Sequence, residues 1–473
     1  MSGWGAIFNN TVSAVLSHSE HLARLQEQAS TGLRVIRGSD DPTGAARILQ
    51  LRTQARSLET YTQNIDAVIL SLEQASAALS SVSDSLVRVR ELATQATTGT
   101  LNQSNRDAIA GEIDGILQQV ITEANHRSLG RFIFSGHSVS TAPYAVETTD
   151  GTITAVTYQG ARTDLQVPVA RGVEYSGLLV GDEVFRSQDR RDPLFLGNTG
   201  VKAGAGTSSV SGDIYLDIRH SSTVFQAPAA GLAKAAASDS SDTIVGLHTL
   251  VVNATNQTLR LDDGPTVSFT LGDTDVTVAT PAGNVMHVDV SGWDGTDATV
   301  AVVAEVDATI DDGLTTTTIT DFSSDAAVAN ADGKLLRIDP SGITRSGIEP
   351  VRVPGTYDLF GTLINIRDLM LNERGLSEDE QLSLLGGAVQ SLQEVTDGIS
   401  RQSAAVGARL QAMDSLKASL DEIHFAAKTE ADATQEADIV TVATELARAQ
   451  TLYEMTLAVS SRLLSMSLLD FLR

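Results

Sequence analysis

The sequence predicts an α+β protein. Both chain ends form a long antiparallel helical coiled-coil bundle with hairpins, and an all-β outer domain is inserted between them. Heptad repeats at both ends predict the bundle, and a change of composition in the middle predicts the β domain. Only 4% of the 473 residues are aromatic. Cores built from Ala, Leu, Val and Ile without aromatic bulk suit helix seams better than one large globule.

A heptad seam follows the N-terminal end. From Ile48 to Ala96, apolar or small residues recur at alternating steps of three and four, and only Thr62 breaks the pattern. Such a run predicts a coiled-coil helix from about residue 43 to residue 99. Two successive steps of three, which join Ile69, Leu72 and Ala75, predict a local stammer. The helix is expected to start at Pro42, behind the capping acids Asp40 and Asp41.

The C-terminal end shows the same periodicity. One predicted helix carries Leu382, Leu385, Val389, Leu392, Ile399, Val406, Leu410, Met413, Leu420 and Ile423. A last helix carries Ile439, Val442, Leu446, Ala449, Tyr453, Thr456, Val459 and Leu463. Helices with a narrow apolar stripe need partners, and the two ends supply each other. We therefore expect residues 58–92 to pack along residues 382–423.

The middle of the chain, residues 198–350, is rich in Thr, Val, Gly and Asp. Asp-Gly turn signals recur between β-prone runs such as 266–271 and 298–306, which predicts hairpins. The segment has 20 acidic and 7 basic residues, a net charge of −13 out of −26 for the whole chain. Its surface is expected to be solvated. The glycine-rich stretch 204–212 lacks a phosphate-loop lysine and is expected to be a flexible linker.

Composition also limits the classes of partner. A net charge of −26 disfavours nucleic acid and anionic membrane surfaces. No cysteine is present, and no apolar run approaches the roughly 18 residues of a membrane span. Residues 1–10 lack the features of a cleaved secretory signal. The chain is therefore expected to stay in the cytoplasm or to leave by a route without such a signal.

A search for catalytic chemistry finds no constellation. His18 and His21 share a helical face, but a metal site needs further ligands. The acidic pairs Asp273/Asp275 and Asp294/Asp297 do not match a calcium loop. No nucleophile elbow or triad is recognisable. We therefore expect no enzyme activity, no cofactor and no metal.

Several segments resemble a known family. Residues 25–42, LQEQASTGLRVIRGSDDP, are similar to the N-terminal signature of the flagellin superfamily. The following Ala45-Ala46-Arg47 and Leu51-Arg52 are similar to the hook-associated protein 3 family. So are Asn125, 130–136 (GRFIFSG), 143–144 (PY), 156–160 (VTYQG), 180–185 (VGDEVF) and the C-terminus from 437–439 to 467–472. Together they cover roughly residues 1–190 and 355–473.

The resemblance implies a three-part subunit of the bacterial flagellum. Residues 1–42 and 428–473 would form a terminal helical core domain. Residues 43–197 and 351–427 would form a helical bundle with a hairpin domain, and residues 198–350 an exposed outer domain. It further implies extracellular location, export through the flagellar type III apparatus, and self-association in a ring-like layer. The implied partners are the neighbouring hook-associated protein, flagellin and an export chaperone.

The predicted function is a structural, hook–filament junction protein. The assembly interface is expected to use apolar residues of the terminal helices: Leu22, Leu25, Ile439, Val442, Leu446, Val459, Leu463, Leu468, Leu469 and Phe471. One alternative is flagellin, the filament subunit itself. A second is an enzyme housed in residues 198–350, and a third is a generic coiled-coil protein.

Overall fold

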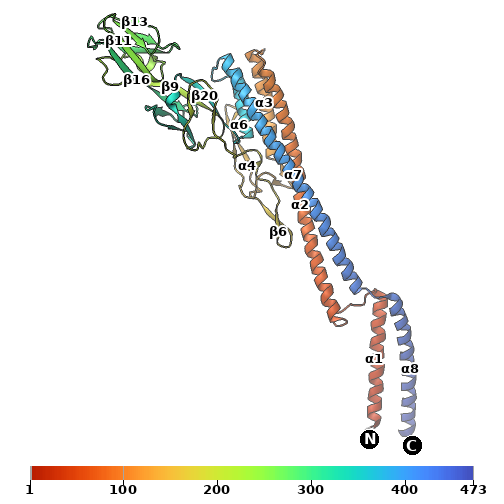
Figure 1. Ribbon diagram of the computed structural model, residues 1–473. Coiled ribbons are helices and arrows are strands. Elements are labelled where there is room, and N and C mark those ends of the chain that lie inside the picture. The colour runs from red at the N-terminus through yellow and green to blue at the C-terminus, as the bar shows by residue number, and fades with distance from the viewer. Residues whose placement is uncertain (1–2, 100, 472–473) are drawn as a thin grey trace. The chain divides into compact units, whose positions relative to one another are not determined.

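The computed structural model describes residues 3–99 and 101–471, with side chains described for residues 9–99 and 101–462. Long helices occupy both ends of the chain and strands fill its middle, as Figure 1 shows. The α+β class is therefore confirmed. The chain divides into two compact units. One contains Met1–Leu70, Gln166–Gly177 and Arg409–Arg473, and the other contains Ser71–Leu165 and Leu178–Ala408.

Six helices carry the two ends. They are α1 (Gly3–Thr31), α2 (Pro42–Ala96), α3 (Gln103–Ala124), α6 (Leu359–Leu371), α7 (Glu378–Gln435) and α8 (Ile439–Phe471). The expected start of α2 at Pro42 is confirmed. Asp41 caps this helix, because its Oδ1 accepts the Gly44 amide at 2.8 Å.

Helices α2 and α7 lie antiparallel, as side-chain contacts in each unit show. In the first unit Thr62 contacts Asp421 at 3.4 Å, and Lys417 pairs with Asp66 at 2.6 Å. In the second unit Arg90 donates to Gln393 at 2.8 Å. In each of these pairs, a residue further along α2 contacts a residue that lies equally many positions earlier in α7. The expected pairing of residues 58–92 with 382–423 is confirmed.

The buried row of α2 corrects the expected stammer. Val68 is buried and Ile69 is only half-buried, so the two successive steps of three join Thr62, Ile65 and Val68 instead. From there the buried row keeps strict alternation to Ala96. The two positions are adjacent in sequence and both apolar, and periodicity alone does not choose between them. In α7, Leu420 and Ala427 are buried, whereas Ile423 is exposed. Ile423 therefore does not belong to the buried row, although the sequence pattern included it.

Helix α2 also contains one apolar window. Among the described residues it is the one helix with 18 residues of mean hydropathy 1.2, which by length and composition alone could cross a membrane. The core helix of a soluble protein passes the same test. The fully buried Leu79, Val82 and Leu86 contribute to this apolar character through the seam itself.

An aromatic cluster forms the core of the hairpin region in the second unit. Phe134 packs edge-on against Phe185 with ring centroids 5.0 Å apart, and Tyr144 lies 4.6 Å from Phe360. The Asn125 side chain holds Tyr144 in place by bonding its backbone N–H (2.9 Å) and C=O (3.0 Å). The motif segments 130–136, 143–144 and 180–185 thus meet in one core, which explains their residue types by packing.

Short antiparallel hairpins surround this core. They are β1 (Arg127–Ser128) with β2 (Arg131–Phe132) and β3 (Tyr144–Thr149) with β4 (Thr152–Tyr158). A further pair, β5 (Gln166–Ala170) with β6 (Val173–Ser176), belongs to the first unit, where Asn64 of α2 donates to the Pro168 carbonyl at 2.8 Å. A one-turn helix, α4 (Gly181–Val184), follows.

The middle of the chain is a strand-rich segment. Its main sheet has the order β13-β12-β11-β16-β9-β20-β7, with β17 paired to β16, and neighbouring strands pair antiparallel. These strands are β7 (Leu194–Phe195), β9 (Gly212–Phe225), β11 (Gly246–Asn253), β12 (Thr258–Leu261), β13 (Val267–Ser268), β16 (Ala298–Thr309), β17 (Thr317–Ile319) and β20 (Gly347–Val353). Two three-stranded sheets, β10-β15-β14 and β18-β19-β8, complete it. Their strands are β8 (Lys202–Ala203), β10 (Ala233–Lys234), β14 (Val276–Ala279), β15 (Val285–Asp289), β18 (Ala326–Ala329) and β19 (Leu335–Asp339).

Of two predictions for the middle of the chain, the Asp-Gly turns are confirmed and the flexible linker is not. The Asp-Gly turns are confirmed by left-handed backbone at Asp262, Gly295, Asp312 and Gly333. The prediction of a flexible linker at 204–212 is wrong. Ser208 is buried, and its hydroxyl accepts the Arg337 amide at 3.0 Å, so this stretch is a hydrogen-bonded part of the β segment.

Candidate assembly surface

The first unit joins the two chain ends through a hydrogen-bonded crossing. Between α1 and α2, Arg34 donates its backbone N–H to the Gln435 carbonyl at 2.7 Å, and its Nη2 donates to the Thr434 carbonyl at 3.0 Å. Gly32 accepts the Ala437 amide at 2.8 Å. Partners separated by 400 residues are therefore fixed side by side. The side-chain contact of Arg34 explains the arginine of the motif segment 25–42, and the positive φ of Gly32 (71°) explains its glycine.

Two aspartates cap helices at this crossing. Asp41 caps α2, and hydrogen bonds from the Gly44 amide and from the Arg34 side chain lower its pKa below the ordinary 3.8. Asp438 caps α8, where its Oδ1 accepts the Val440 amide at 2.9 Å. Hydrogen bonds from Thr441 and Val440 lower the pKa of Asp438 as well.

Acid is expected to loosen this crossing. Because both pKa values are lowered in the folded state, the stabilisation is present above the ordinary pKa. It is lost as pH falls below about 4 and through the lowered values. Helical circular dichroism should decline in that window, and the protection factors of amides 33–36 and 435–437, corrected for the intrinsic pH dependence of exchange, should fall.

The matched control for the acid experiment is Asp41→Asn with Asp438→Asn, because asparagine caps a helix without titrating. In this variant the crossing should lose its part of the pH dependence. Unchanged protection factors at these amides between pH 5 and pH 2.5 in the parent chain would contradict the assignment.

Helices α1 and α8 lie side by side beyond this crossing, as Figure 1 shows. Leu25, Val442 and Ala449 are buried in their contact, and Leu22 and Leu446 pack against them. The seam is narrow, as expected for a pair with few large side chains. Four of the residues predicted for assembly therefore lie inside the chain's own helix pair.

Outside this seam, the same two helices expose large apolar side chains. On α8, Leu452 is 51% exposed, Met455 60% and Val459 55%, at spacing that places them on one flank. On α1, Leu16 is 58% exposed. We call the set Leu452, Met455 and Val459 the α8 flank. An apolar patch of this kind on a helix is typical of a contact surface.

The other predicted interface residues divide into two groups. Ile439 and Val459 are exposed and belong to the free surface of α8. Leu463, Leu468, Leu469 and Phe471 lie outside the residues whose side chains are described. The sequence prediction omitted Leu452 and Met455. Both fall between the heptad positions, and it is their large apolar character off the seam that marks them as a second apolar flank.

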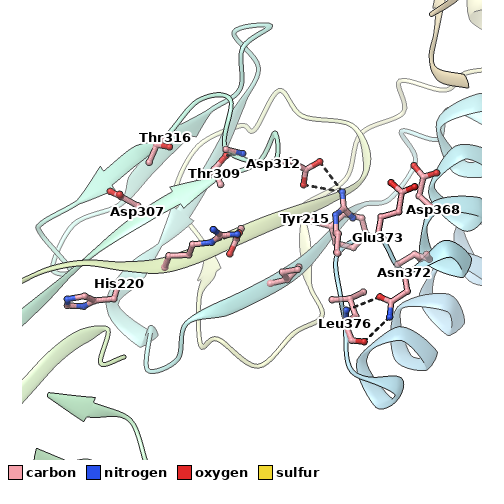
Figure 2. A pocket seen from close by; sticks show the side chains of 16 residues that line it. Tyr215, His220, Asp307, Thr309, Asp312, Thr316, Asp368, Asn372, Glu373 and Leu376 are labelled. Atoms are coloured by element: carbon pink, nitrogen blue, oxygen red, sulfur yellow. Dashed lines mark hydrogen bonds and ion pairs between the residues drawn. The ribbon is translucent and has the colours of Figure 1, made fainter. Parts of the chain in front are cut away.

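The second unit contains a polar cleft of about 600 Å³ between the β segment and α6, shown in Figure 2. Both of its arginines pair with a carboxylate of the cleft. Arg219 contacts Asp217 at 2.5 Å, and Arg374 reaches Asp312 at 3.2 Å. Burial raises the pKa of Tyr215 to about 12, so its hydroxyl stays protonated and donates to Asn365. The arrangement is that of a polar contact between a sheet and a helix.

Among residues 9–99 and 101–462, no three His, Asp or Glu side chains converge. His18 and His21 are both on α1. The pairs Asp273/Asp275 and Asp294/Asp297 lie in the turns of the β segment, and Asp294 Oδ1 accepts from the Thr296 amide and hydroxyl.

Comparisons with known proteins bear on the class of the chain. Residues 6–138 match the family model described as the bacterial flagellin N-terminal helical region. This is the region that folds into α1, α2, α3 and the first hairpin. The class of protein that this region resembles is therefore the flagellin superfamily.

Within that class, the chain is similar to flagellar hook-associated protein 3 of Escherichia coli (strain K12). The two are 30% identical over 144 residues, 30% of this chain and 45% of that protein. The flagellin of Bacillus subtilis (strain 168) is 36% identical over 129 residues, 25% of this chain and 42% of that protein. The chain spans less than half the length of these curated relatives. The resemblance predicted from the motif segments is confirmed.

A solved structure is also similar. The crystal structure of flagellar hook associated protein-3 from Legionella pneumophila aligns over 81% of this chain and 97% of that one. The sequence identity is 16% and the TM-score 0.44.

Proposed function

We propose that this chain is a structural subunit of the bacterial flagellum that joins hook to filament as a hook-associated junction protein. The observation that carries the proposal is the α8 flank, three exposed apolar side chains on the helix pair made by the two chain ends. The similarity of residues 6–138 to flagellin supports it independently. The role is structural, and no catalytic step is assigned.

The α8 flank supplies assembly energy when a neighbouring subunit covers it. Full burial of a Leu or Met side chain is worth roughly 1.5–3 kcal/mol. Three such residues in each subunit, repeated around a ring-like layer, provide a cooperative contact. In this proposal the seam residues Leu22, Leu25, Val442 and Leu446 shape the helix pair, and Ile439, Val459 and the C-terminal Leu463, Leu468, Leu469 and Phe471 join the contact with neighbours.

The finer organisation belongs to the same proposal. Residues 1–42 with 428–473 form the terminal core domain, 43–197 with 351–427 the bundle and hairpin domain, and 198–350 the all-β outer domain. The α2–α7 pair acts as an antiparallel coiled coil. The subunit leaves through the flagellar type III apparatus to an extracellular position. Its partners are further copies, a neighbouring hook-associated protein, flagellin and an export chaperone.

A filament subunit is the second candidate. The 36% identity to Bacillus subtilis flagellin over 129 residues favours it. The two functions differ in number of copies and in place, because a flagellin forms long filaments and a junction protein forms one layer.

Removing the gene separates the candidates. Loss of the junction protein should leave complete hooks without filaments, with intact flagellin released into the medium. If the chain is instead the flagellin, its loss should leave no flagellin in the medium. Complementation with the parent chain should restore filaments, and filaments of normal length and number without the gene would contradict both functions.

A further inference from the structure

Two stretches of the β segment repeat one sequence pattern. Residues 275–293 read DVTVATPAGNVMHVDVSGW, and residues 325–343 read DAAVANADGKLLRIDPSGI. The same residue stands at equivalent places, at an offset of 50. These pairs are Asp275/Asp325, Val278/Val328, Ala279/Ala329, Gly283/Gly333, Asp289/Asp339, Ser291/Ser341 and Gly292/Gly342.

Both stretches form the same hairpin. Strand β14 pairs with β15 from Val276↔Val288 to Ala279↔Val285, and β18 pairs with β19 from Ala326↔Ile338 to Ala329↔Leu335. These registers correspond residue for residue at the offset of the sequence repeat. The turn at the end of each hairpin also repeats, since Asp289 Oδ1 accepts the Ser291 amide at 2.9 Å and Asp339 Oδ1 accepts the Ser341 amide at 2.9 Å.

A third strand joins each hairpin in the same way. Strand β10 places Ala233 opposite Asp289, and strand β8 places Lys202 opposite Asp339. The glycine before each strand has positive φ, and a Cβ there would overlap a backbone carbonyl. For Gly231 that carbonyl belongs to Gly292, and for Gly200 it belongs to the equivalent Gly342.

The large sheet shows the same correspondence. Strand β11 pairs with β16 over seven residues from Gly246↔Ala304 to Val252↔Ala298. Strand β9 pairs with β20 over seven residues from Gly212↔Val353 to Ile218↔Gly347. The order β13-β12-β11-β16 is thus repeated as β17-β16-β9-β20. The long strand β16 takes part in both halves, and its register shifts between Glu305 and Val306, where one half meets the other.

We propose that the outer β segment consists of two copies of one β-module, with one copy inserted into the other between β9 and β16. The proximal module contains β7, β8, the first part of β9, the second part of β16, and β17 to β20. The distal module contains β10 to β15 and the first part of β16. Each has its own core: Leu250, Val278, Met286 and Val300 belong to the distal core, and Leu216, Val328, Leu336 and Val351 to the proximal core.

Among the described residues, the side-chain contacts that the β segment makes to α6 and α7 come from the proximal module. Tyr215 donates to Asn365 of α6 at 2.7 Å, and Arg352 donates to Gln390 of α7 at 2.9 Å. The equivalent positions in the distal module are Thr249 and Val303, which cannot make these contacts. The two copies have therefore diverged in role, and the distal module is a removable extension.

The first test is a deletion in the full chain designed on the repeated register. In the distal module, the partners Asn253 and Thr258 are joined by the turn 254–257 (ATNQ). The equivalent partners in the proximal module are Arg219 and Asp307. Residues 220–306 are replaced by Ala-Thr-Asn-Gln between those two partners. Amides of β19 and β20 should remain protected from hydrogen exchange, although loss of Val245 and Val306 from the proximal core should lower the melting temperature.

The matched control replaces residues 247–333, a deletion of the same length that cuts both modules, by the same four residues. This control should lose protection in β19 and β20. Loss of protection in the register-based deletion to the same extent as in the control would overturn the proposal.

The second test keeps the chain intact. Met286→Ala in the distal core should accelerate exchange in β14 and β15 by about a hundredfold and leave β18 and β19 unchanged. Leu336→Ala in the proximal core should accelerate exchange in β18 and β19. Equal acceleration in both modules by Met286→Ala would show one shared core and overturn the proposal. Because the readout is folding, the outcome does not depend on the proposed flagellar function.

Discussion

Replacing Leu452 and Met455 of the α8 flank by aspartate is expected to abolish filament attachment on cells producing the variant. Both side chains are more than half exposed in the single chain, so the change leaves the α1–α8 seam intact. In an assembled layer, each aspartate would put an unpaired charge where an apolar side chain had been covered. The loss of apolar burial alone is worth roughly 1.5–3 kcal/mol for each residue in every subunit.

The measurement counts filaments per cell by electron microscopy, with circular dichroism of the purified monomer to show that the helices persist. The control is Ala443→Asp with Gln450→Asp, which adds the same charge to the opposite side of α8, where both residues are exposed. This control should retain filaments. Equal loss of filaments in both variants would show that charge on α8, rather than the α8 flank, decides assembly.

The largest effect on folding is expected from Phe134→Ala. Phe134 is fully buried and packs against Phe185, and truncating a buried Phe costs about 3–5 kcal/mol because the cavity collapses only in part. Amides of 131–136 and 181–185 should then exchange about 10² to 10³ times faster.

Leu129→Ala is the control for that measurement. Leu129 lies at the tip of the same hairpin, is 80% exposed and has a left-handed backbone, so its truncation removes little contact. Its exchange profile should match the parent chain. A Phe134→Ala profile equal to that of Leu129→Ala would contradict the role of the aromatic cluster as the core of this region.

The helical part of the fold was predictable because local sequence patterns determine it. Heptad spacing, the Asp41–Pro42 start and matching seams predicted α2, α7 and their pairing. Which of Val68 and Ile69 faces inward was not predictable, since both are apolar and adjacent, and the partner's surface decides. The stretch 204–212 looked like a linker because glycine and serine favour loops, but its hydroxyls accept hydrogen bonds from distant strands.

The candidate surface was predictable only in part. Heptad reasoning selects residues that face a partner helix, so Leu25 and Val442 were chosen although the partner proved to be the chain's own other end. Leu452 and Met455 of the α8 flank lie off that seam, so heptad reasoning left them out, and their exposure places them on the surface. The repeat of 275–293 at 325–343 is visible in the sequence, but its nesting needs the strand registers, because the single strand β16 serves both modules.

The most direct measurement for the account as a whole is immunogold labelling of isolated flagella with antibodies raised against residues 198–350. That segment carries a net charge of −13 and many exposed side chains, so it presents good epitopes. The account predicts gold particles confined to the boundary between hook and filament. Gold along the whole filament would contradict the junction role and identify the chain as a filament subunit.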